Sequence, residues 1–469
     1  MKKQIIYSIL SVVAFCCVGC NKFDDSINTD TNNPSAATNM QLINNAALYL
    51  PGLSSSPQGE YNAQFLSETQ YPNLSLYTQE NFDFTGYYTG PLMNLEEVLL
   101  HEQDLNSNEW PFNNQLAIAK VLKAYFFWHI TDRWGDVPYT EALRGGENFT
   151  PAYETQQNIY NNIFTLLDEA NSMISGANIS NDIIYDGDMD KWKKLANTIH
   201  LLAALRLSNA DADKGKTEFN KALNAGIMTS NDDNLVFRHR NEEASWNFWF
   251  DEIENKGRYW WGLSKLLVDN MKPVDDPRLE VYGDPNTLGE YEGLEYGTLE
   301  PSAEDPSLLG SAIWEVDAPV QLVTYAQALF AQAEAAKLGW TGGGDVSAQD
   351  FYEGAIEQSL LQWKNNTNGL AEMMAHSEIA YDPATALQQI ATQRWIHLFM
   401  HGYEAWAEWR RTGYPNLVPP AGDPDRAVPL RQAYPVTEQF NNKTNYDAAV
   451  QQQFGGTDNL NGKLWWDKP

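Results

Sequence analysis

The feature that most constrains the fold is a long helical pattern over residues 382–414. Asp382 can cap the start of a helix, and Pro383 stands in the first turn, where its missing N–H loses no partner. Gly413 and Pro415 end the pattern. About thirty helical residues span roughly 45 Å, so the sequence predicts one long helix that acts as a scaffold. The apolar residues that recur every three or four positions, and so share one face, are Leu387, Ala391, Trp395, Leu398, Gly402, Ala405 and Trp409.

Helical periodicity recurs along much of the remaining chain. The pattern from Trp192 to Ile199 matches the opening of a tetratricopeptide helix, in which small residues let a partner helix approach closely. The alanine-rich stretches near residues 319–338 and 348–363 are similar to another hairpin of this type. The predicted fold class is therefore mainly α, with tetratricopeptide-type helical hairpins as its scaffold. Helices are expected at residues 40–49, 91–101, 113–131, 154–175, 193–208, 216–226, 319–338 and 348–363.

Aromatic residues are dense in two segments where helical periodicity is weak. Residues 235–318 contain many glycines, prolines and aspartates, and residues 71–90 form a second irregular stretch. Rings in such segments are less committed to a helix–helix core, so they are candidates for ligand contact. The candidate ligand-binding residues are Trp246, Trp249 and Tyr259 in the first segment and Tyr77, Phe82 and Tyr87 in the second.

Charge and cysteine content exclude several classes of function. The chain has 31 basic and 62 acidic residues, a net charge of −31, which disfavours nucleic acid and anionic lipid headgroups as partners. Its 16 Trp and 23 Tyr suit a surface that stacks on sugars or holds another protein. The three cysteines, Cys16, Cys17 and Cys20, are all near the N-terminus, so the body of the protein has no disulfide, cysteine nucleophile or thiolate zinc site.

The N-terminus has the pattern of an export signal that ends in a lipid anchor. A positive start precedes an apolar stretch, residues 5–18, that is too short to span a bilayer. The residues Val18-Gly19-Cys20 resemble a bacterial lipobox, although Cys17 stands where leucine is usual. We expect residues 1–19 to be a signal peptide and Cys20 to be acylated; the alternative is an ordinary secretory signal with an incidental cysteine. Residues 20–39 would be a flexible tether, and residues 21–25 resemble a cell-surface sorting signal.

Motifs along nearly the whole chain resemble SusD/RagB-type nutrient-binding outer-membrane lipoproteins. They occur at residues 125–143, 187–197, 275–279, 393–415, 431–442 and 462–467. The resemblance implies one SusD-like domain over residues 40–469, with its helical scaffold mainly in 91–234 and 319–414. The loop-rich segments 235–318 and 415–469 would contribute the ligand-facing part. It also implies a surface-exposed protein that captures a nutrient, commonly an oligosaccharide, and delivers it to a SusC-like TonB-dependent transporter.

No catalytic or cofactor motif accompanies this pattern. The sequence has no Gly-x-Ser-x-Gly elbow, no P-loop and no His-Glu-x-x-His. His397 and His401 have a spacing that could hold zinc, but no nearby motif supplies a third ligand, so no metal or cofactor is expected. We interpret the carboxylates of residues 186–190 as a helix start capped by Asp190 rather than as a calcium loop, because the glycine and glutamate of an EF-hand are misplaced.

Two alternatives stay open. A helical-toroid carbohydrate hydrolase would also be acidic and rich in tryptophan, and Asp132 and Asp136 are its only plausible pair of carboxylates. The second alternative is an assembly subunit whose aromatic residues contact protein instead of a ligand. We predict a binding protein without catalytic activity, and the sequence does not distinguish a glycan from a peptide.

Overall fold

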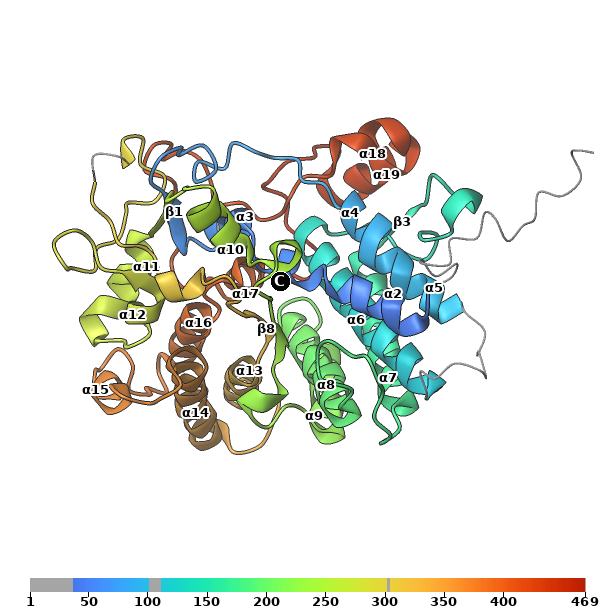
Figure 1. The fold of residues 1–469 in the computed structure, drawn as a ribbon, viewed down its shortest axis with the longest axis horizontal. Coiled ribbons are helices and arrows are strands. Elements are labelled where there is room, and N and C mark those ends of the chain that lie inside the picture. The colour runs from blue at the N-terminus through green and yellow to red at the C-terminus, as the bar shows by residue number, and fades with distance from the viewer. Residues whose placement is uncertain (1–36, 101–110, 302–303, 469) are drawn as a thin grey trace, which may run out of the picture.

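The computed structural model describes residues 37–100, 111–301 and 304–468. Over these residues the fold is mainly helical, as the sequence predicts (Figure 1). The predicted signal peptide, Cys20 and most of the expected tether lie outside the described residues. Within the described ranges, no helix combines the length and the apolar character that crossing a membrane requires.

Three helical hairpins form the scaffold. Helix α6 (Phe112–Trp134) packs on α7 (Gln156–Met173), α8 (Met189–Arg206) on α9 (Ala212–Ala225), and α13 (Tyr325–Lys337) on α14 (Gly344–Lys364). Because α7 also contacts α8 and α8 contacts α13, the hairpins form one array that runs from right to left in Figure 1. The outer face of α6 is covered by α2 (Asn39–Ala47) and α5 (Met93–Leu100).

Side-chain caps fix where several of these helices begin. Thr324 and Gln327 form a capping box at α13, and the Thr155 hydroxyl accepts from the Asn158 backbone N–H at α7. At α8 the cap is Asp188, two residues before the predicted Asp190; its carboxylate accepts from the backbone N–H groups of Asp190 at 3.0 Å and Lys191 at 3.2 Å. The helix expected from residue 319 begins later, because strand β8 (Val320–Val323) pairs there with β4 (Leu235–Phe237).

The prediction of one long helix is wrong, because this region forms two helices. Helix α16 (Ala386–His397) and α17 (Gly402–Thr412) are separated by a turn in which Met400 has a φ of 62°. A Cβ on Gly402 would lie 2.2 Å from the carbonyl carbon of Gly59, so two backbones pack directly there. The Glu60 carboxylate accepts from the Gly402 N–H at 2.9 Å. The apolar spacing continues across this break, so the sequence pattern alone could not reveal it.

A buried charge cluster joins five helices around α17. Arg206 contacts Glu404 at 2.7 Å, Arg394 contacts Glu408 at 2.8 Å, and Arg411 contacts Glu408 at 2.6 Å. Burial alone would raise the pKa of Glu408, but the three guanidinium groups together lower it well below its usual value. The members of the cluster, which come from α6, α8, α13, α16 and α17, are Asp132, Arg206, Glu334, Arg394, Glu404, Glu408 and Arg411.

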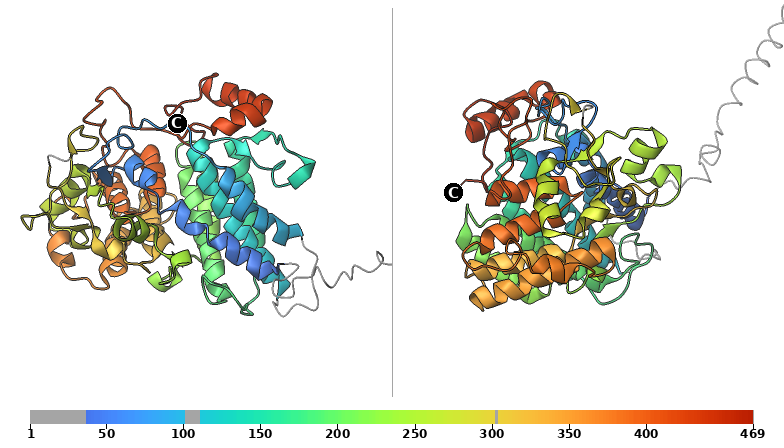
Figure 2. Two further views of the ribbon diagram at one scale, coloured as in Figure 1. Left: turned by 45° about the horizontal axis from the view of Figure 1, so that its top comes forward. Right: turned by 90° about the vertical axis from the view of Figure 1, so that its left-hand side faces the viewer.

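The loop-rich part has its own sheet and hydrophobic core. Strands β1 (Leu66–Glu68), β5 (Trp261–Leu263), β7 (Leu308–Leu309) and β6 (Gly283–Asp284) pair antiparallel in that order. This core is separate from the one inside the α6–α9 hairpins, and Figure 2 shows the two lobes side by side. Helix α17 contributes to both cores. The short helices of the left-hand lobe include α3 (Pro57–Asn62), α10 (Phe248–Phe250), α11 (Lys265–Met271), α12 (Leu279–Tyr282) and α15 (Leu370–Met374).

The C-terminal segment, expected to be mostly loop, contains two helices. They are α18 (Val436–Asn441) and α19 (Lys443–Phe454), at the top right of Figure 1. Asn442 donates to the Pro151 carbonyl at 2.8 Å, beside the short pair of strands β2 (Val137–Pro138) and β3 (Tyr153–Glu154). Polar contacts therefore attach these helices to the loop that follows α6, near α4 (Thr85–Tyr87).

Candidate functional site

The pairing of β1 with β5 brings together aromatic residues from distant parts of the chain. The Thr69 N–H donates to the Trp260 carbonyl at 2.8 Å, just beyond the paired strands. This register places the Tyr71 ring 5.1 Å from the Trp260 ring, at an angle of 86°. Tyr71 is 56% exposed, and the Arg258 guanidinium lies over the Trp260 ring at 5.1 Å. The pair therefore forms an exposed aromatic corner with a cation beside it.

Tyr259, the residue before Trp260, forms a second perpendicular ring pair with Trp314. Their ring centroids are 6.4 Å apart at an angle of 85°. Tyr259 is 50% exposed, and its hydroxyl donates to Glu254 at 3.1 Å. We call the four residues Tyr71, Tyr259, Trp260 and Trp314 the aromatic surface. Tyr71 and Tyr259 are exposed, whereas Trp260 and Trp314 are half-buried against the core of the left-hand lobe. Exposed ring faces of this kind are what the faces of sugar rings pack against.

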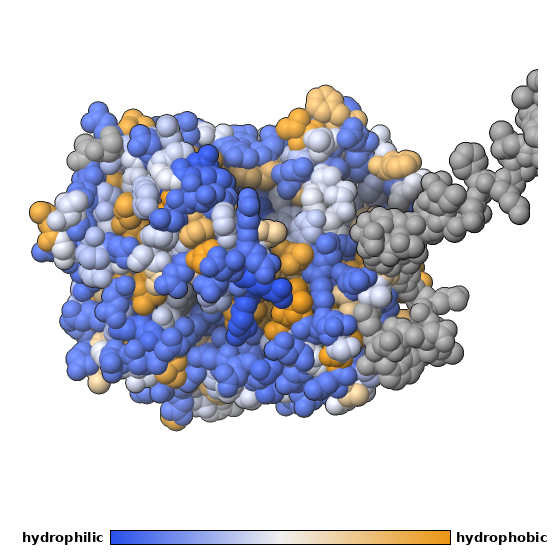
Figure 3. Space-filling model, in the orientation of Figure 1, coloured by the Kyte–Doolittle hydropathy of each residue, from blue (hydrophilic) through white to orange (hydrophobic). Residues whose placement is uncertain are grey.

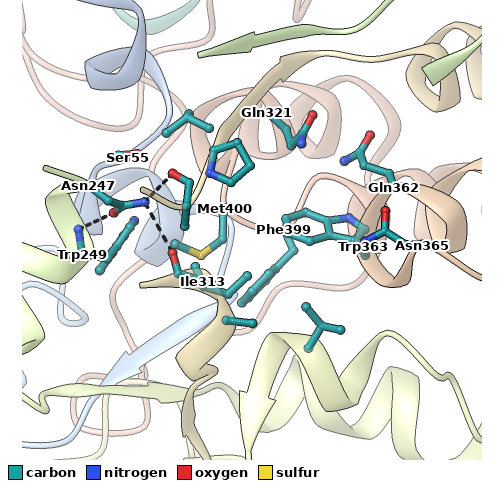
Figure 4. Close-up of a pocket in the computed structure, with 15 residues that line it drawn as sticks. Ser55, Asn247, Trp249, Ile313, Gln321, Gln362, Trp363, Asn365, Phe399 and Met400 are labelled. Carbon is teal, nitrogen blue, oxygen red and sulfur yellow. Dashed lines mark hydrogen bonds between the residues drawn. The ribbon is translucent and has the colours of Figure 1, made fainter. Parts of the chain in front are cut away.

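Two cavities lie on either side of the segment from Trp246 to Trp249. Trp246 and Phe248 line a cavity of about 550 Å³ together with Ser55 and His239, and burial keeps the pKa of His239 below its usual value. Asn247 and Trp249 line a smaller cavity of about 230 Å³ (Figure 4). Trp249 is only 2% exposed, and its ring meets Trp261 at 5.2 Å and 89°. It is part of the core of the left-hand lobe.

The structure separates the six predicted ligand-binding residues. Trp246 lines the larger cavity and Tyr259 lies on the aromatic surface, whereas Trp249 is in the core of the left-hand lobe. Tyr77 is in the same core, 1% exposed, with its hydroxyl accepting from Gln64 at 3.0 Å.

The other two predicted residues, Phe82 and Tyr87, are half-buried against the core of the opposite lobe. The Tyr87 hydroxyl accepts from Arg133 at 3.1 Å. Tyr71, Trp260 and Trp314 are not among the residues predicted from the sequence to bind a ligand. Only the strand register, which joins positions about 190 residues apart, could have singled out the first two.

The two carboxylates considered for hydrolysis are both engaged in the fold. Asp132 accepts from the Tyr160 hydroxyl at 2.5 Å and lies 3.2 Å from the Arg206 Nε. Asp136 accepts from the Gln156 backbone N–H at 2.7 Å, and burial raises its pKa to about 6. Each carboxylate has a structural partner, and neither lines one of the two cavities beside Trp249.

The two histidines considered for zinc also have partners inside the protein. His397 lies between the hydroxyls of Thr324, at 2.7 Å, and Ser359, at 2.9 Å. His401 stacks on His129 at 5.4 Å, on the other side of the break between α16 and α17. Burial lowers the pKa of both His397 and His401 to about 3. Over the ranges that the structure describes, no group of three or more histidine, cysteine, aspartate or glutamate side chains could hold a metal ion.

The face of the molecule drawn in Figure 3 is mostly hydrophilic. Figure 3 shows hydrophobic residues in small separate patches on a largely hydrophilic face. A hydrophilic face agrees with the net charge of −31. On this face the hydrophobic residues do not join into one broad apolar area.

Comparison with known families decides what kind of protein this is. A family described as starch-binding and associating with the outer membrane matches residues 31–435. The chain belongs to the SusD-like family. A comparison with curated proteins finds no match.

Solved structures share the fold over most of this chain. A chitin-binding protein is 28% identical with a TM-score of 0.80, covering 92% of this chain and all of its own. A SusD homologue from Bacteroides fragilis is 25% identical, with the same TM-score and coverage. A chitin-binding SusD homologue from Flavobacterium johnsoniae is 24% identical with a TM-score of 0.75, covering 92% of this chain and 96% of its own. The last of these shows the likeness of fold alone.

Proposed function

We propose that this protein binds a nutrient glycan at the outer membrane and delivers it to a SusC-like TonB-dependent transporter. Family membership supports an outer-membrane carbohydrate-binding role. The observation that carries the proposal is the aromatic surface, where each of two perpendicular ring pairs in the loop-rich lobe combines an exposed tyrosine with a half-buried tryptophan. Chitin is the first glycan to test, because the relative that is 28% identical is described as chitin-binding.

Lipid anchoring and surface exposure complete the proposal. Acylation of Cys20 would attach the protein, and residues 21–39 would leave the body free to move above the membrane. Replacing Cys20 with alanine should release the protein from the outer-membrane fraction, and unchanged partition would contradict the anchor. Gentle detergent extraction of the unmodified protein should also recover a large barrel protein with it.

Binding without catalysis is the third part. Asp132 and Asp136 both have structural partners, so neither is free to serve as an acid or base beside a sugar. The isolated protein should therefore bind an oligosaccharide and return it unchanged after prolonged incubation. Turnover that disappears in Asp132→Asn or Asp136→Asn would instead favour a hydrolase.

A glycan array with the anchor-free protein, residues 21–469, tests ligand binding. Trp260→Ala should weaken binding of the best glycan about fivefold, since one stacked ring contributes on the order of 1 kcal/mol. Phe149→Ala is the matched control, because Phe149 is 81% exposed and lies outside the aromatic surface. Absence of any bound glycan, or affinity that neither Trp260→Ala nor Trp314→Ala changes, would overturn the proposed site.

A further inference from the structure

Glu68 is the last residue of strand β1, which Figure 1 labels in the left-hand lobe. In the antiparallel register it lies opposite Trp261. The next residue, Thr69, donates its backbone N–H to the Trp260 carbonyl at 2.8 Å. A little further along the chain is Tyr71, whose ring meets the Trp260 ring at 5.1 Å. Glu68 therefore adjoins both halves of the Tyr71–Trp260 pair without belonging to the aromatic surface.

The backbone of Glu68 also holds the turn that follows Tyr71. The Glu68 N–H donates to the Ser75 hydroxyl at 3.1 Å, and Ser75 is fully buried. Ser75 belongs to the turn at residues 72–77, so this hydrogen bond ties the turn to the end of β1. A displacement of Glu68 would therefore reach Tyr71 through the turn and Trp260 through the β1–β5 ladder.

The Glu68 carboxyl group is buried and has no cation beside it. Glu68 is only 6% exposed, and its Oε1 accepts from the Tyr61 hydroxyl at 2.8 Å. Its Oε2 has no hydrogen-bond partner in the part of the chain that the structure describes, and no described lysine, arginine or histidine forms an ion pair with it. Burial raises the pKa of Glu68 to about 7, so the carboxyl group is neutral at mildly acidic pH.

The titratable groups around Glu68 cannot compensate a charge on it. Tyr61 and Tyr296 face it, and burial raises the pKa of both phenols well above their usual value. Glu60, which adjoins Tyr61 in the chain, has a pKa raised to about 8. Phenols and carboxyl groups are never positively charged, so none of these groups can neutralise a carboxylate at this position.

Trp261, on the neighbouring strand, presents a second polar atom without a partner. Side chains of directly opposed residues in an antiparallel pair lie on the same face of the sheet, with Cβ atoms about 5 Å apart. The Trp261 indole N–H is buried and has no acceptor among the described residues. The Trp261 ring lies 6.1 Å from the Trp260 ring. An ionised Glu68 could draw this N–H toward itself, and a turn of the Trp261 ring would displace Trp260.

We propose that the neutral Glu68 carboxyl group positions Tyr71 and Trp260 for glycan binding, and that ionisation of Glu68 weakens the site. This inference rests on the proposed function, because it concerns the same aromatic surface. Glu68 is a positioning residue, since it is buried and acts on the glycan only through its neighbours. A charge without a partner at this depth is costly, so an ionised Glu68 would move toward water or a donor. Either movement disturbs the turn after Tyr71 or the ladder at Trp260, and a smaller fraction of the protein is then competent to bind.

Titrations with an uncharged glycan at several pH values test the positioning role. Triacetylchitotriose has no group that ionises between pH 6 and pH 8, so a change in its affinity reports on the protein. The anchor-free protein should bind it roughly three- to tenfold more weakly at pH 8 than at pH 6, since the competent fraction falls as Glu68 ionises. Another uncharged glycan from the array takes its place if this trisaccharide does not bind.

Glu68→Gln removes the titration and keeps the shape of the neutral group. The glutamine oxygen can still accept from the Tyr61 hydroxyl, so this variant should bind equally well at pH 6 and pH 8. Two control variants should keep the full pH dependence, namely Glu290→Gln at an exposed position and Glu60→Gln at the neighbouring buried acid. A pH dependence that persists in Glu68→Gln, or that disappears in Glu60→Gln, would overturn the assignment to Glu68.

Tyr61→Phe gives an independent test with a definite sign. The hydrogen bond from Tyr61 stabilises the ionised form of Glu68 and so lowers its pKa. Removal of the hydroxyl should raise that pKa and move the fall in affinity to higher pH. A merely structural role of Tyr61 would weaken binding at every pH and leave the midpoint of the profile in place, which would contradict the role of Glu68.

A signal from Trp261 follows the change without any glycan. In protein that contains isotope-labelled tryptophan, the indole N–H resonance of Trp261 is assigned by its loss in Trp261→Phe. It should shift as the pH rises through about 7 and stay constant in Glu68→Gln, and an identical shift in both proteins would contradict the coupling. Glycan affinity that is the same at every pH would overturn the positioning role and leave glycan binding intact. Absence of binding to any glycan at any pH would instead overturn the proposed function.

Discussion

Arginine lies over tryptophan in two regions of this protein, and the surroundings of the two pairs differ. In the core beside α17, the Arg410 guanidinium is 3.8 Å from the centre of the Trp406 ring, and it also donates to the Leu430 carbonyl at 3.1 Å. Both residues are buried. On the aromatic surface, Arg258 lies 5.1 Å from Trp260, and 40% of its side chain is exposed. One pair is enclosed by the scaffold, and the other leaves ring area free.

The same contrast holds for charged groups. In the buried charge cluster each guanidinium is within a few ångströms of a carboxylate, because an unpaired charge at such depth would be very costly. Ion pairs such as Lys265 with Asp269 lie in solvent and contribute little. Arginine, tryptophan and carboxylate side chains therefore stabilise the buried core beside α17, whereas the same residue types on the loop-rich lobe are partly exposed. Substitutions can separate the two roles.

The largest effect should come from Glu408→Gln in the buried charge cluster. Arg394 would lose its nearest carboxylate, at 2.8 Å, since its next contacts are at 3.8 and 4.0 Å. We expect a loss of roughly 3–5 kcal/mol in the free energy of unfolding, measured by urea denaturation. Asp269→Asn is the exposed control and should change it by less than about 1 kcal/mol. Equal losses in the two variants would contradict the comparison.

A similar loss should follow Trp249→Ala, but not Trp260→Ala. Trp249 is 2% exposed and packs against Trp261, so its removal should leave a cavity and cost roughly 3–5 kcal/mol. Trp260→Ala should change stability by no more than about 1 kcal/mol and act on glycan affinity instead. Thermal melts of both variants measure the loss of stability, and titrations with glycan measure the loss of affinity. If Trp249→Ala kept its stability and lost binding, Trp249 would be a direct ligand contact, as the sequence analysis predicted.

The sequence predicted the mainly helical fold because helical periodicity is a local property. Most of the expected helices are present within a few residues of their predicted bounds, for example α7 at Gln156–Met173. The break in the C-terminal helix was missed because its cause is not local. The direct packing of Gly402 on Gly59 joins positions about 340 residues apart, and the apolar stripe continues through it.

The site was harder to predict for the same reason. Aromatic density selected candidate residues, but it could not show which rings would be buried. Tyr77 is in an irregular segment and is nevertheless 1% exposed, because Tyr296 and Gln64 enclose it. The exposed Tyr71 and the half-buried Trp260 come together only through the register of β1 and β5. Burial of a ring follows from tertiary packing and not from local periodicity.

A pH-dependent effect distinguishes the interior of the protein from its surface. Burial raises the pKa of Glu60 to about 8 from an ordinary value near 4.5, so between these pH values the folded state holds a proton that the unfolded chain has lost. Stability should therefore fall as the pH rises through this window, by at most about 1.4 kcal/mol per pH unit from this group. Glu60→Gln should remove that contribution.

The measurement is the difference in unfolding free energy between the unmodified protein and Glu60→Gln, taken at pH 5 and pH 9. The variant should gain stability relative to the unmodified protein at pH 9. Other titrating groups, including Glu68 with its raised pKa of about 7, are common to both proteins and cancel in the difference. Glu290→Gln, at an exposed position, should give the same difference at both pH values. A Glu60→Gln difference that does not change with pH would show that Glu60 is ionised in the folded state.

The smallest effect should come from Arg258→Gln, and it tests the opening comparison most directly. The guanidinium is partly exposed and paired with Glu252, so the loss of stability should be below about 1 kcal/mol. Loss of its contact with Trp260 should change glycan affinity no more than about fivefold.

Arg410→Gln removes a similar stack in the core together with buried hydrogen bonds, so it should cost considerably more stability. Salt separates them further, because 0.5 M sodium chloride screens an exposed charge and leaves a buried one little affected. The comparison therefore fails if both variants lose the same stability, or if high salt reduces both losses equally.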